Sequence, residues 1–249
     1  MERSALIGQL RALPPGRRLI TALDVPDADS ALALARNLGP AGGFVKVGLE
    51  LFSAAGPGVV ADLRGLGRDI FLDLKYHDIP NTVASAARQA ARMGAALCTI
   101  HAGNGRASLQ AAAAALAEAP VAPGGRRPAL LAVTVLTSLS AGDLEEVAPG
   151  GGSLADRVAR LATLAWESGC DGLVCSAADL PDLRRVVGPA PLVVTPGIRP
   201  ASGSADDQKR IATPRQAAEA GADFLVIGRP VTGAADPAAA LAAIAQEFA

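Results

Sequence analysis

The stretch DIFLDLKYHDIPNTVASAARQAARMG, residues 69–94, contains one complete repeat of the predicted fold. Its first part, residues 69–75, is rich in branched and aromatic apolar residues and predicts a buried β-strand. Its last part, residues 82–94, places apolar residues at helical spacing and stops at Gly94, a common end signal for a helix. The stretch therefore predicts a strand followed by an α-helix.

The same unit recurs along the chain. Eight apolar segments are predicted as strands: LITAL (19–23), FVKVG (44–48), DIFLDLK (69–75), ALCTIH (96–101), ALLAVTVL (129–136), DGLVCS (171–176), PLVVTP (191–196) and DFLVIG (223–228). Helical segments rich in alanine and leucine lie between most of them. Eight such units predict an α/β fold, a single-domain (β/α)8 TIM barrel over residues 1–249. An open doubly wound sheet is the alternative, but no GxGxxG motif follows the first strand.

Composition excludes several classes of protein. Of the 249 residues, 50% are hydrophobic, which provides a sizeable core and argues against disorder. A net charge of -1 and an aromatic content of 3% suit neither phosphate-backbone binding nor base stacking, so no nucleic-acid partner is expected. No secretory signal or membrane-spanning run is evident. With three cysteines and no close pair among them, the sequence predicts a cytoplasmic protein without a membrane partner.

Two residue types could be mistaken for catalytic groups. Cys98, Cys170 and Cys175 are interpreted as buried small apolar residues rather than nucleophiles. His77 and His101 could act as a general base, but the preferred interpretation is that they hold the site by hydrogen bonds. Neither histidine lies near a cysteine with the spacing of a zinc site.

Charged and polar residues lie at or near the predicted C-terminal ends of nearly all the strands, where barrel enzymes carry their reactive groups. They are Asp24, Lys46, Asp73, Lys75, Asp78, His101, Thr137, Ser138, Arg199 and Arg229. Lysines that alternate with aspartates form a fixed array that can stabilise charge developing in a reaction. Because the ammonium groups already occupy the carboxylates, no metal is expected. A structural ion pair between Asp73 and Lys75 that braces the barrel is the alternative.

Two glycine-containing turns, TPGIR and VIGRPV, follow the last two predicted strands, and each supplies an arginine. Barrels of this type often bind phosphate at this position. Gln208 and Arg210 lie in the long polar segment 198–210 between these turns, which is typical of a lid. The pattern predicts a phosphate site, although either turn alone would be interpreted as a surface turn.

Seven motifs resemble the orotidine 5′-phosphate decarboxylase family in its common bacterial form: ALDVPD (22–27), VKVGLELF (45–52), FLDLKYHDIPNTV (71–83), VTVLTS (133–138), TPGIRP (195–200), DDQKR (206–210) and VIGRPV (226–231). They run in the family's order over most of the chain, and the third is the most specific. The resemblance implies a cofactor-free carboxy-lyase that converts orotidine 5′-phosphate to UMP and CO2, the last step of UMP biosynthesis.

The resemblance also implies a role for each matching residue. Lys75 is expected to be the proton donor, with Lys46, Asp73 and Asp78 as the rest of the catalytic charged array. Asp73 is expected to lie near the departing carboxylate. Asp78 and Thr82 are expected to reach into the neighbouring site of a homodimer. The remaining implied contacts are Asp24 and Lys46 with the ribose region, Thr137 with the pyrimidine, and Arg199, Gln208, Gly228 and Arg229 with the phosphate.

Two other functions stay open. A Mg-dependent sister barrel acting on sugar phosphates would share the Asp-x-Lys-x-x-Asp strand. Such enzymes typically have an acidic residue in place of Lys46 and lack the Ile-Pro-Asn-Thr that follows here. A catalytically inactive barrel that only binds nucleotides is the second alternative, and the intact set of Asp73, Lys75 and Asp78 argues against it.

Overall fold

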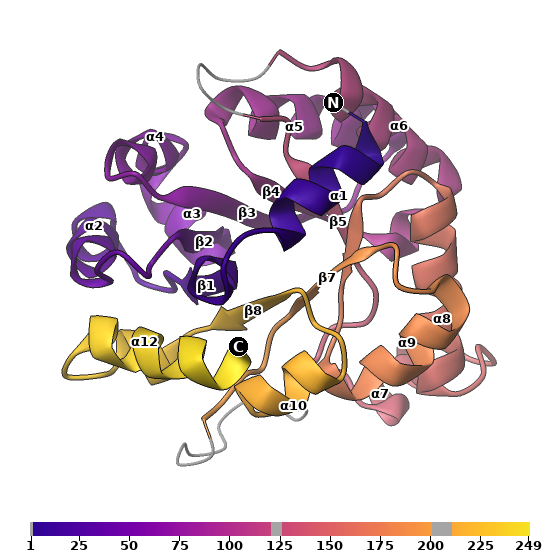
Figure 1. Cartoon of the computed structure of the whole chain (residues 1–249). Coiled ribbons are helices and arrows are strands. Elements are labelled where there is room, and N and C mark those ends of the chain that lie inside the picture. Colours follow the sequence, from indigo (N-terminus) through magenta and orange to yellow (C-terminus); the bar gives the residue numbers. More distant parts are fainter. Residues whose placement is uncertain (1, 121–125, 201–210) are drawn as a thin grey trace.

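The computed structural model describes residues 2–120, 126–200 and 211–249. Within these ranges the strands are β1 (Leu19–Ala22), β2 (Phe44–Gly48), β3 (Asp69–Tyr76), β4 (Leu97–His101), β5 (Ala129–Val133), β6 (Gly172–Val174), β7 (Leu192–Thr195) and β8 (Phe224–Ile227). Neighbouring strands are parallel, and β8 pairs with β1, so the sheet closes into a barrel in sequence order (Figure 1). This closure confirms the predicted (β/α)8 barrel and rules out the open sheet.

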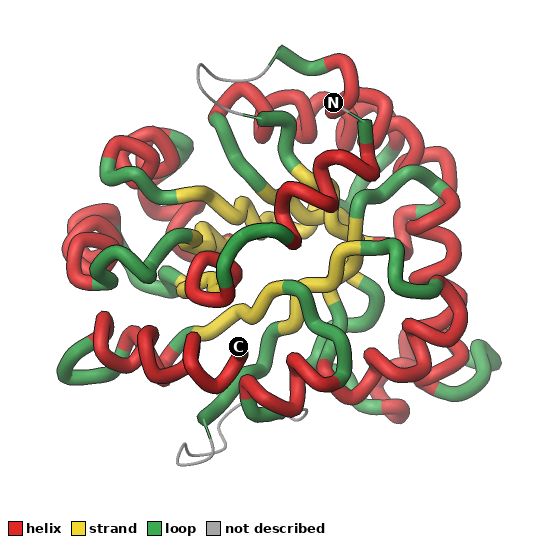
Figure 2. Tube along the Cα trace, viewed as in Figure 1, coloured by secondary structure: helices red, strands yellow, loops and turns green. Residues whose placement is uncertain are grey.

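The helices surround the barrel (Figure 2). In the described ranges they are α1 (Arg3–Arg11), α2 (Ala28–Asn37), α3 (Leu49–Ala55), α4 (Gly58–Gly65), α5 (Pro80–Met93), α6 (Arg106–Glu118), α7 (Ala141–Val147), α8 (Leu154–Glu167), α9 (Leu180–Val187), α10 (Pro214–Glu219), α11 (Arg229–Thr232) and α12 (Pro237–Phe248). Short 3-10 turns lie at Pro15–Arg18, Ala102–Asn104 and Ala177–Asp179. None of the helices described is long and apolar enough to cross a membrane.

The repeat at residues 69–94 folds as the sequence predicts. Helix α5 begins with Pro80, whose fixed φ and missing N–H suit the first turn of a helix. Its last residue is Met93, and the Gly94 that follows has a φ of 81°, in the left-handed region that glycine adopts without strain. The buried face of α5 carries small residues such as Ala87 and Ala90, which allow the helix to pack closely against the barrel.

The core has two layers. Inside the barrel, Phe44 and Phe224 meet edge to face with their ring centroids 5.4 Å apart. Leu6 and Leu10 of α1 join the same cluster, and Figure 1 shows α1 lying across one end of the barrel. A second layer of strand residues such as Leu72 packs outward against the helices. The strands are therefore buried on both faces, which explains their nearly continuous apolar sequences.

Strand β5 is shorter than predicted. The sequence predicted a strand over 129–136, whereas β5 ends at Val133. Its neighbour β6 has only three residues and ends at Val174, so the ladder has no further partner. The Thr134 N–H makes one last bond to the Val174 carbonyl at 3.2 Å, and the chain then leaves the sheet. The residues that follow, including Thr137, therefore form a loop.

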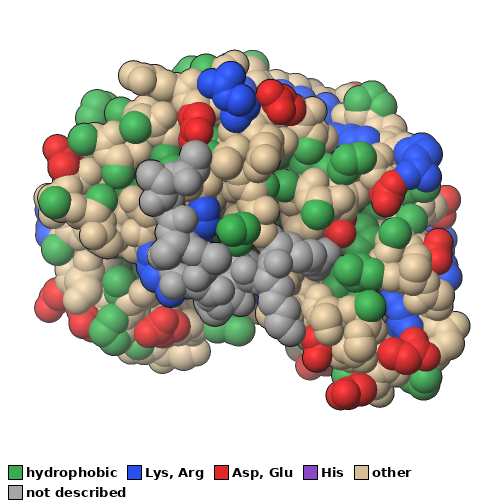
Figure 3. All heavy atoms as spheres, turned by 90° about the horizontal axis from the view of Figure 1, so that it is seen from below, with side chains coloured by type: hydrophobic (Ala, Val, Ile, Leu, Met, Phe, Trp, Pro, Cys, Tyr) green, Lys and Arg blue, Asp and Glu red, His purple; other side chains and the backbone are tan. Residues whose placement is uncertain are grey.

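Ion pairs brace the end of the barrel where the strands begin. Each of three aspartates at or just before the start of β3, β6 and β8 binds an arginine at 2.8 Å, in the pairs Arg17–Asp69, Arg127–Asp171 and Arg11–Asp223. Arg127 binds both oxygens of Asp171, whose side chain is 1% exposed. Such a bidentate pair fixes the loop before β5 to the start of β6. On the face drawn in Figure 3, acidic and basic side chains are interspersed rather than gathered by sign.

Replacing Asp171 by alanine is expected to destabilise the protein by about 3–5 kcal/mol. The change would leave the Arg127 guanidinium and the Leu130 N–H, both of which bind this carboxylate, without their partner. Urea denaturation followed by circular dichroism measures the effect. Glu167→Ala is the control, because its pair with Arg106 is exposed and should contribute less than about 1 kcal/mol. Equal midpoints for the two variants would contradict the assignment.

Candidate active site

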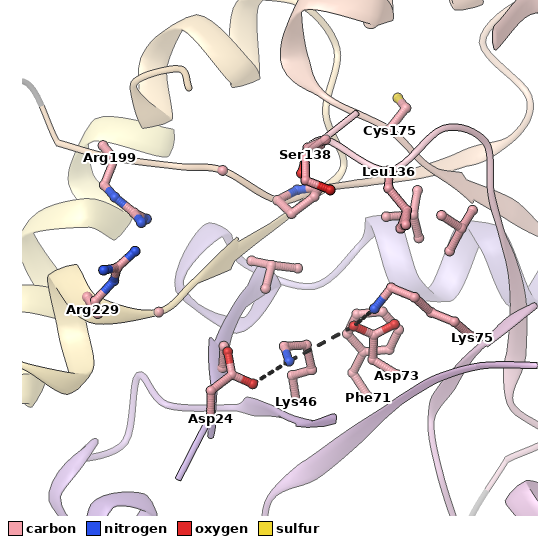
Figure 4. A pocket seen from close by; sticks show the side chains of 18 of the residues that line it. Asp24, Lys46, Phe71, Asp73, Lys75, Leu136, Ser138, Cys175, Arg199 and Arg229 are labelled. Carbon is pink, nitrogen blue, oxygen red and sulfur yellow. Dashed lines mark hydrogen bonds and ion pairs between the residues drawn. The ribbon is translucent and has the colours of Figure 1, made fainter. Parts of the chain in front are cut away.

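A pocket of about 520 Å³ lies at the C-terminal ends of the strands. Residues in or just after most of the strands line it, and Figure 4 shows that their side chains converge on one space. Part of its wall is apolar and includes Phe71, Val133, Leu136 and Val226. The pocket is therefore a mixed site, with a row of charges on one side and apolar surface on another.

Four charged side chains form a continuous row along one wall (Figure 4). The Lys46 Nζ lies 2.7 Å from Asp24 Oδ1 and 4.0 Å from Asp73 Oδ2. The Lys75 Nζ donates a hydrogen bond of 2.7 Å to the same Asp73 oxygen. The row thus alternates in sign from Asp24 through Lys46 and Asp73 to Lys75, as the sequence analysis expected. The Asp73 side chain is 10% exposed, so this carboxylate is nearly enclosed by its partners.

The backbone of Lys75 is unusual. Its φ is 49°, in the left-handed region that costs a side-chain-bearing residue about 1–2 kcal/mol. The pairing of β3 with β4 also shifts here, from Leu72 opposite Cys98 to Tyr76 opposite Ile100, so β3 bulges. Phe71, Asp73 and Lys75 nevertheless all line the pocket, as the alternation of side chains along a strand predicts, so the irregularity lies in the backbone at Lys75. Strain of this kind persists only where surrounding contacts maintain it.

Thr99 on β4 is a polar residue of this region that the sequence analysis did not single out. It is fully buried, and its hydroxyl lies 3.0 Å from Asp73 Oδ1 and 2.9 Å from the Lys75 backbone nitrogen. It does not line the pocket but lies behind the charged row. The sequence did contain a signal for it. Thr99 lies two residues after Leu97, which faces the barrel interior, so an alternating strand places Thr99 on the same face.

Two arginines lie at the other side of the pocket. Figure 4 shows the guanidinium groups of Arg199 and Arg229 facing one another. The Arg199 side chain is largely buried and donates to the Ile198 carbonyl at 2.9 Å, and no described carboxylate forms an ion pair with it. Gly228, which precedes α11, also lines this end of the pocket.

The histidines contact each other rather than the pocket. The rings of His77 and His101 contact each other at a tilt of 36°, with their centroids 5.3 Å apart, and neither residue lines the pocket. Burial, followed by the nearby His77 and Lys75, lowers the pKa of His101 and favours its neutral ring. This ring contact replaces, among the described residues, the hydrogen bonds that the sequence analysis expected.

The cysteines are buried, as expected. None of the three forms a disulfide, and burial raises the pKa of Cys170 to about 12, which disfavours the nucleophilic thiolate. Cys175 lines the pocket but is only 1% exposed. In the described part of the chain, no group of three or more histidine, cysteine or acidic side chains is arranged to bind a metal ion.

The structure brings together most of the predicted site residues. Those that line the pocket are Asp24, Lys46, Asp73, Lys75, Thr137, Arg199, Gly228 and Arg229. Asp78 and Thr82 are exposed and do not line it, and Gln208 lies outside the described residues. The single chain therefore does not bring Asp78 or Thr82 into its own pocket.

The fold and the pocket together define a (β/α)8-barrel enzyme whose charged groups gather where the strands end. The sequence model described as "Orotidine 5'-phosphate decarboxylase / HUMPS family" matches residues 17–244. The chain belongs to this family.

Similar proteins agree with this assignment over nearly the whole chain. A protein of Nitrosospira multiformis named orotidine 5′-phosphate decarboxylase is 50% identical over 231 residues, 93% of each chain. One of the same name from Moorella thermoacetica is 47% identical and covers 93% of this chain and 92% of its own. The crystal structure of orotidine 5′-phosphate decarboxylase from Lactobacillus acidophilus has a TM-score of 0.83 at 42% identity, covering 92% of this chain and 98% of that one.

Proposed function

We propose how this chain, a carboxy-lyase, carries out the decarboxylation of orotidine 5′-phosphate to UMP in pyrimidine biosynthesis. The observation that supports the mechanism is the row of alternating charges that ends at Lys75, with its Nζ 2.7 Å from Asp73. Breaking the bond between C6 and the carboxylate leaves an electron pair in the plane of the ring, where no neighbouring carbonyl delocalises it. The reaction therefore needs a nearby positive charge more than a conventional cofactor.

In the proposed reaction, Lys75 supplies that charge and then the proton. The C6–carboxylate bond breaks, CO2 leaves, and the electron pair stays on C6. A proton then moves from the Lys75 ammonium to C6, which forms the C6–H bond of UMP and leaves a neutral amine. Solvent returns a proton to the amine before the next turnover. Asp73 holds Lys75 in line, and Lys46 stabilises Asp73 from the other side.

The arginine end of the pocket is assigned to the phosphate. Arg199 and Arg229 offer planar guanidinium groups that suit phosphate oxygens, and Gly228 leaves room for the phosphate to approach the backbone. With the phosphate there, Asp24 and Lys46 would bind the ribose and Thr137 the pyrimidine. Binding energy from the phosphate can then be used to fix the substrate against the charged row.

We also propose a homodimer in which Asp78 and Thr82 complete the neighbouring site. Both residues are exposed in the single chain and lie outside its own pocket. The adjacent Ile79 side chain is 66% exposed, and Leu49, the first residue of α3, is 59% exposed. Large apolar side chains exposed this far support a contact with another protein surface. A twofold contact would carry Asp78 of each subunit toward the other.

Mixing two inactive variants tests the dimer and the shared site together. Lys75→Ala and Asp78→Ala are each expected to lose activity. In a mixed dimer, one site carries both changes and the other carries neither. Equal mixing after subunit exchange should restore about a quarter of the wild-type rate. The rate is measured from the change in ultraviolet absorbance of orotidine 5′-phosphate, with EDTA present because the carboxylates are occupied by lysines and no metal is expected to be needed. No recovery in proven mixed dimers would contradict the shared site.

Gly48→Ala is expected to lower kcat/KM about tenfold or more by moving Lys46. An alanine Cβ at this position would lie 2.8 Å from the Lys46 Nζ and 3.4 Å from Asp24 Oδ1. The backbone φ of -97° suits alanine, so the effect would come from the side chain. Gly65→Ala on α4 is the matched control, because a Cβ there would meet no atom within 4 Å apart from its chain neighbours and the nearby backbone of its own helix. Equal rates in the two variants would show that Lys46 tolerates displacement.

A cytoplasmic location is proposed for this enzyme. The three cysteines are buried and form no disulfide, as is usual for proteins kept in a reducing compartment.

A further inference from the structure

The hydroxyl of Thr99 lies between the two residues at the end of the charged row. The Lys75 backbone nitrogen lies 2.9 Å from it, and Asp73 Oδ1 lies 3.0 Å from it. A backbone nitrogen can only donate, so the hydroxyl accepts from Lys75 and directs its own proton to the carboxylate. The side chain is fully buried, which strengthens both bonds because water does not compete for them.

Thr99 lies on β4 at the point where the pairing between β3 and β4 becomes irregular. Between the pairs Leu72–Cys98 and Tyr76–Ile100, β3 advances four residues while β4 advances two. The Lys75 N–H therefore lacks a regular ladder partner, and the Thr99 hydroxyl takes that place. In the part of the chain that the structure describes, Lys75 is the only non-glycine residue with a positive φ. Thr99 is thus bonded to the backbone of this strained residue.

The other hydrogen bond fixes the orientation of Asp73. With Oδ1 held by Thr99, the remaining oxygen, Oδ2, is presented to both lysines, at 2.7 Å from the Lys75 Nζ and 4.0 Å from the Lys46 Nζ. Without the hydroxyl, the carboxylate could rotate and Lys75 could relax toward an extended strand. Either movement would shift the ammonium group away from its position in the pocket.

We propose that Thr99 is a positioning residue for the decarboxylation, one that maintains the left-handed backbone of Lys75 and the orientation of Asp73. It does not line the pocket, so it acts through these two residues and not on the substrate. The inference rests on the proposed role of Lys75 as proton donor. It predicts that loss of the hydroxyl lowers the rate of the chemical step much more than the affinity for ligand.

Thr99→Val tests this prediction, because valine keeps the branched shape and removes the donor and acceptor. We expect kcat to fall about 10- to 100-fold, as for the loss of hydrogen bonds to a charged group. KM and the Kd for UMP should change less than about threefold, because the phosphate and ribose contacts remain. Thr99→Ser, which keeps the hydroxyl, should retain kcat within about threefold of the wild type. A normal kcat in folded Thr99→Val protein would overturn the proposal.

Two further variants control for stability. Thr21→Val replaces another fully buried strand threonine, whose hydroxyl has no hydrogen-bond partner among the described residues, and should leave kcat unchanged. If Thr99→Val does not fold, Thr99→Cys replaces it and is compared with Thr99→Ser. These side chains have equal atom counts but differ in hydrogen-bond strength. A kcat about tenfold lower for cysteine supports the proposal, and equal values overturn it.

The failure of this inference can be told apart from failure of the mechanism. If Lys75→Ala retains normal turnover, the role of Lys75 is wrong and Thr99 has nothing to position. If Lys75→Ala is inactive and Thr99→Val keeps a normal kcat, only the role of Thr99 is overturned.

Discussion

Lys75→Ala is expected to lower turnover of orotidine 5′-phosphate by at least about 10⁴-fold while the protein stays folded. The substitution removes both the cation that would stabilise the C6 carbanion and the proton that would quench it. It also removes the 2.7 Å partner of Asp73 Oδ2, so the negative charge near the substrate carboxylate would be compensated only by Lys46, at 4.0 Å, and by the Thr99 hydroxyl. Initial rates from ultraviolet absorbance, with thermal melting as the check on folding, measure the effect.

The binding of UMP distinguishes lost chemistry from a lost pocket. The Kd for UMP should change far less than the rate in Lys75→Ala, because the arginine end of the pocket is intact. Arg36→Ala, which removes an exposed cation on α2 outside the pocket, serves as the control and should keep the wild-type rate. Substantial turnover by Lys75→Ala would require another proton donor.

Arg229→Ala is expected to reduce kcat/KM for orotidine 5′-phosphate about 10²- to 10³-fold through loss of contacts to the phosphate. The guanidinium lies across the pocket from the charged row, so this effect would act at a distance from the bond that breaks (Figure 4). Orotidine, which lacks the phosphate, should be a poor substrate for the wild type. Its slow rate should barely change in the variant.

The comparison of two substrates makes this prediction specific. A general disturbance of the pocket would slow orotidine and its phosphate by the same factor, and that result would refute the phosphate assignment. Arg215→Ala is the matched control, because Arg215 is an exposed arginine on α10 that does not line the pocket. It should leave both rates unchanged.

The barrel fold could be predicted because the same strand–helix pattern recurs along the sequence. Each unit combines an apolar strand with an amphipathic helix, and eight units leave few other topologies. The grouping of Asp24, Lys46 and Asp73 could also be predicted, because parallel strands in a barrel bring their C-terminal ends to one side. The lengths of the strands were harder to predict, as β5 shows, because the end of a strand depends on the length of its neighbour.

The left-handed backbone conformation of Lys75 could not be predicted from the local sequence pattern. An alternating strand places residues 71, 73 and 75 on one face and gives no sign that β3 bulges against β4. The Lys75 N–H at this bulge donates to Thr99, which lies 24 residues further along the chain and meets Lys75 only in the folded sheet. Contacts between residues far apart in the chain, such as this one, help to determine how a side chain of the site is oriented, and a single sequence does not reveal them.

The ion pairs at the start of the strands have a consequence for how such a protein can evolve. Arg127–Asp171 and its counterparts fasten one rim of the barrel, while the charged row and the arginines occupy the opposite rim. Mutations that recruit a new substrate can accumulate on the second rim while the first rim continues to secure the scaffold. A library randomised only in the loops that follow the strands should therefore yield a high proportion of folded proteins.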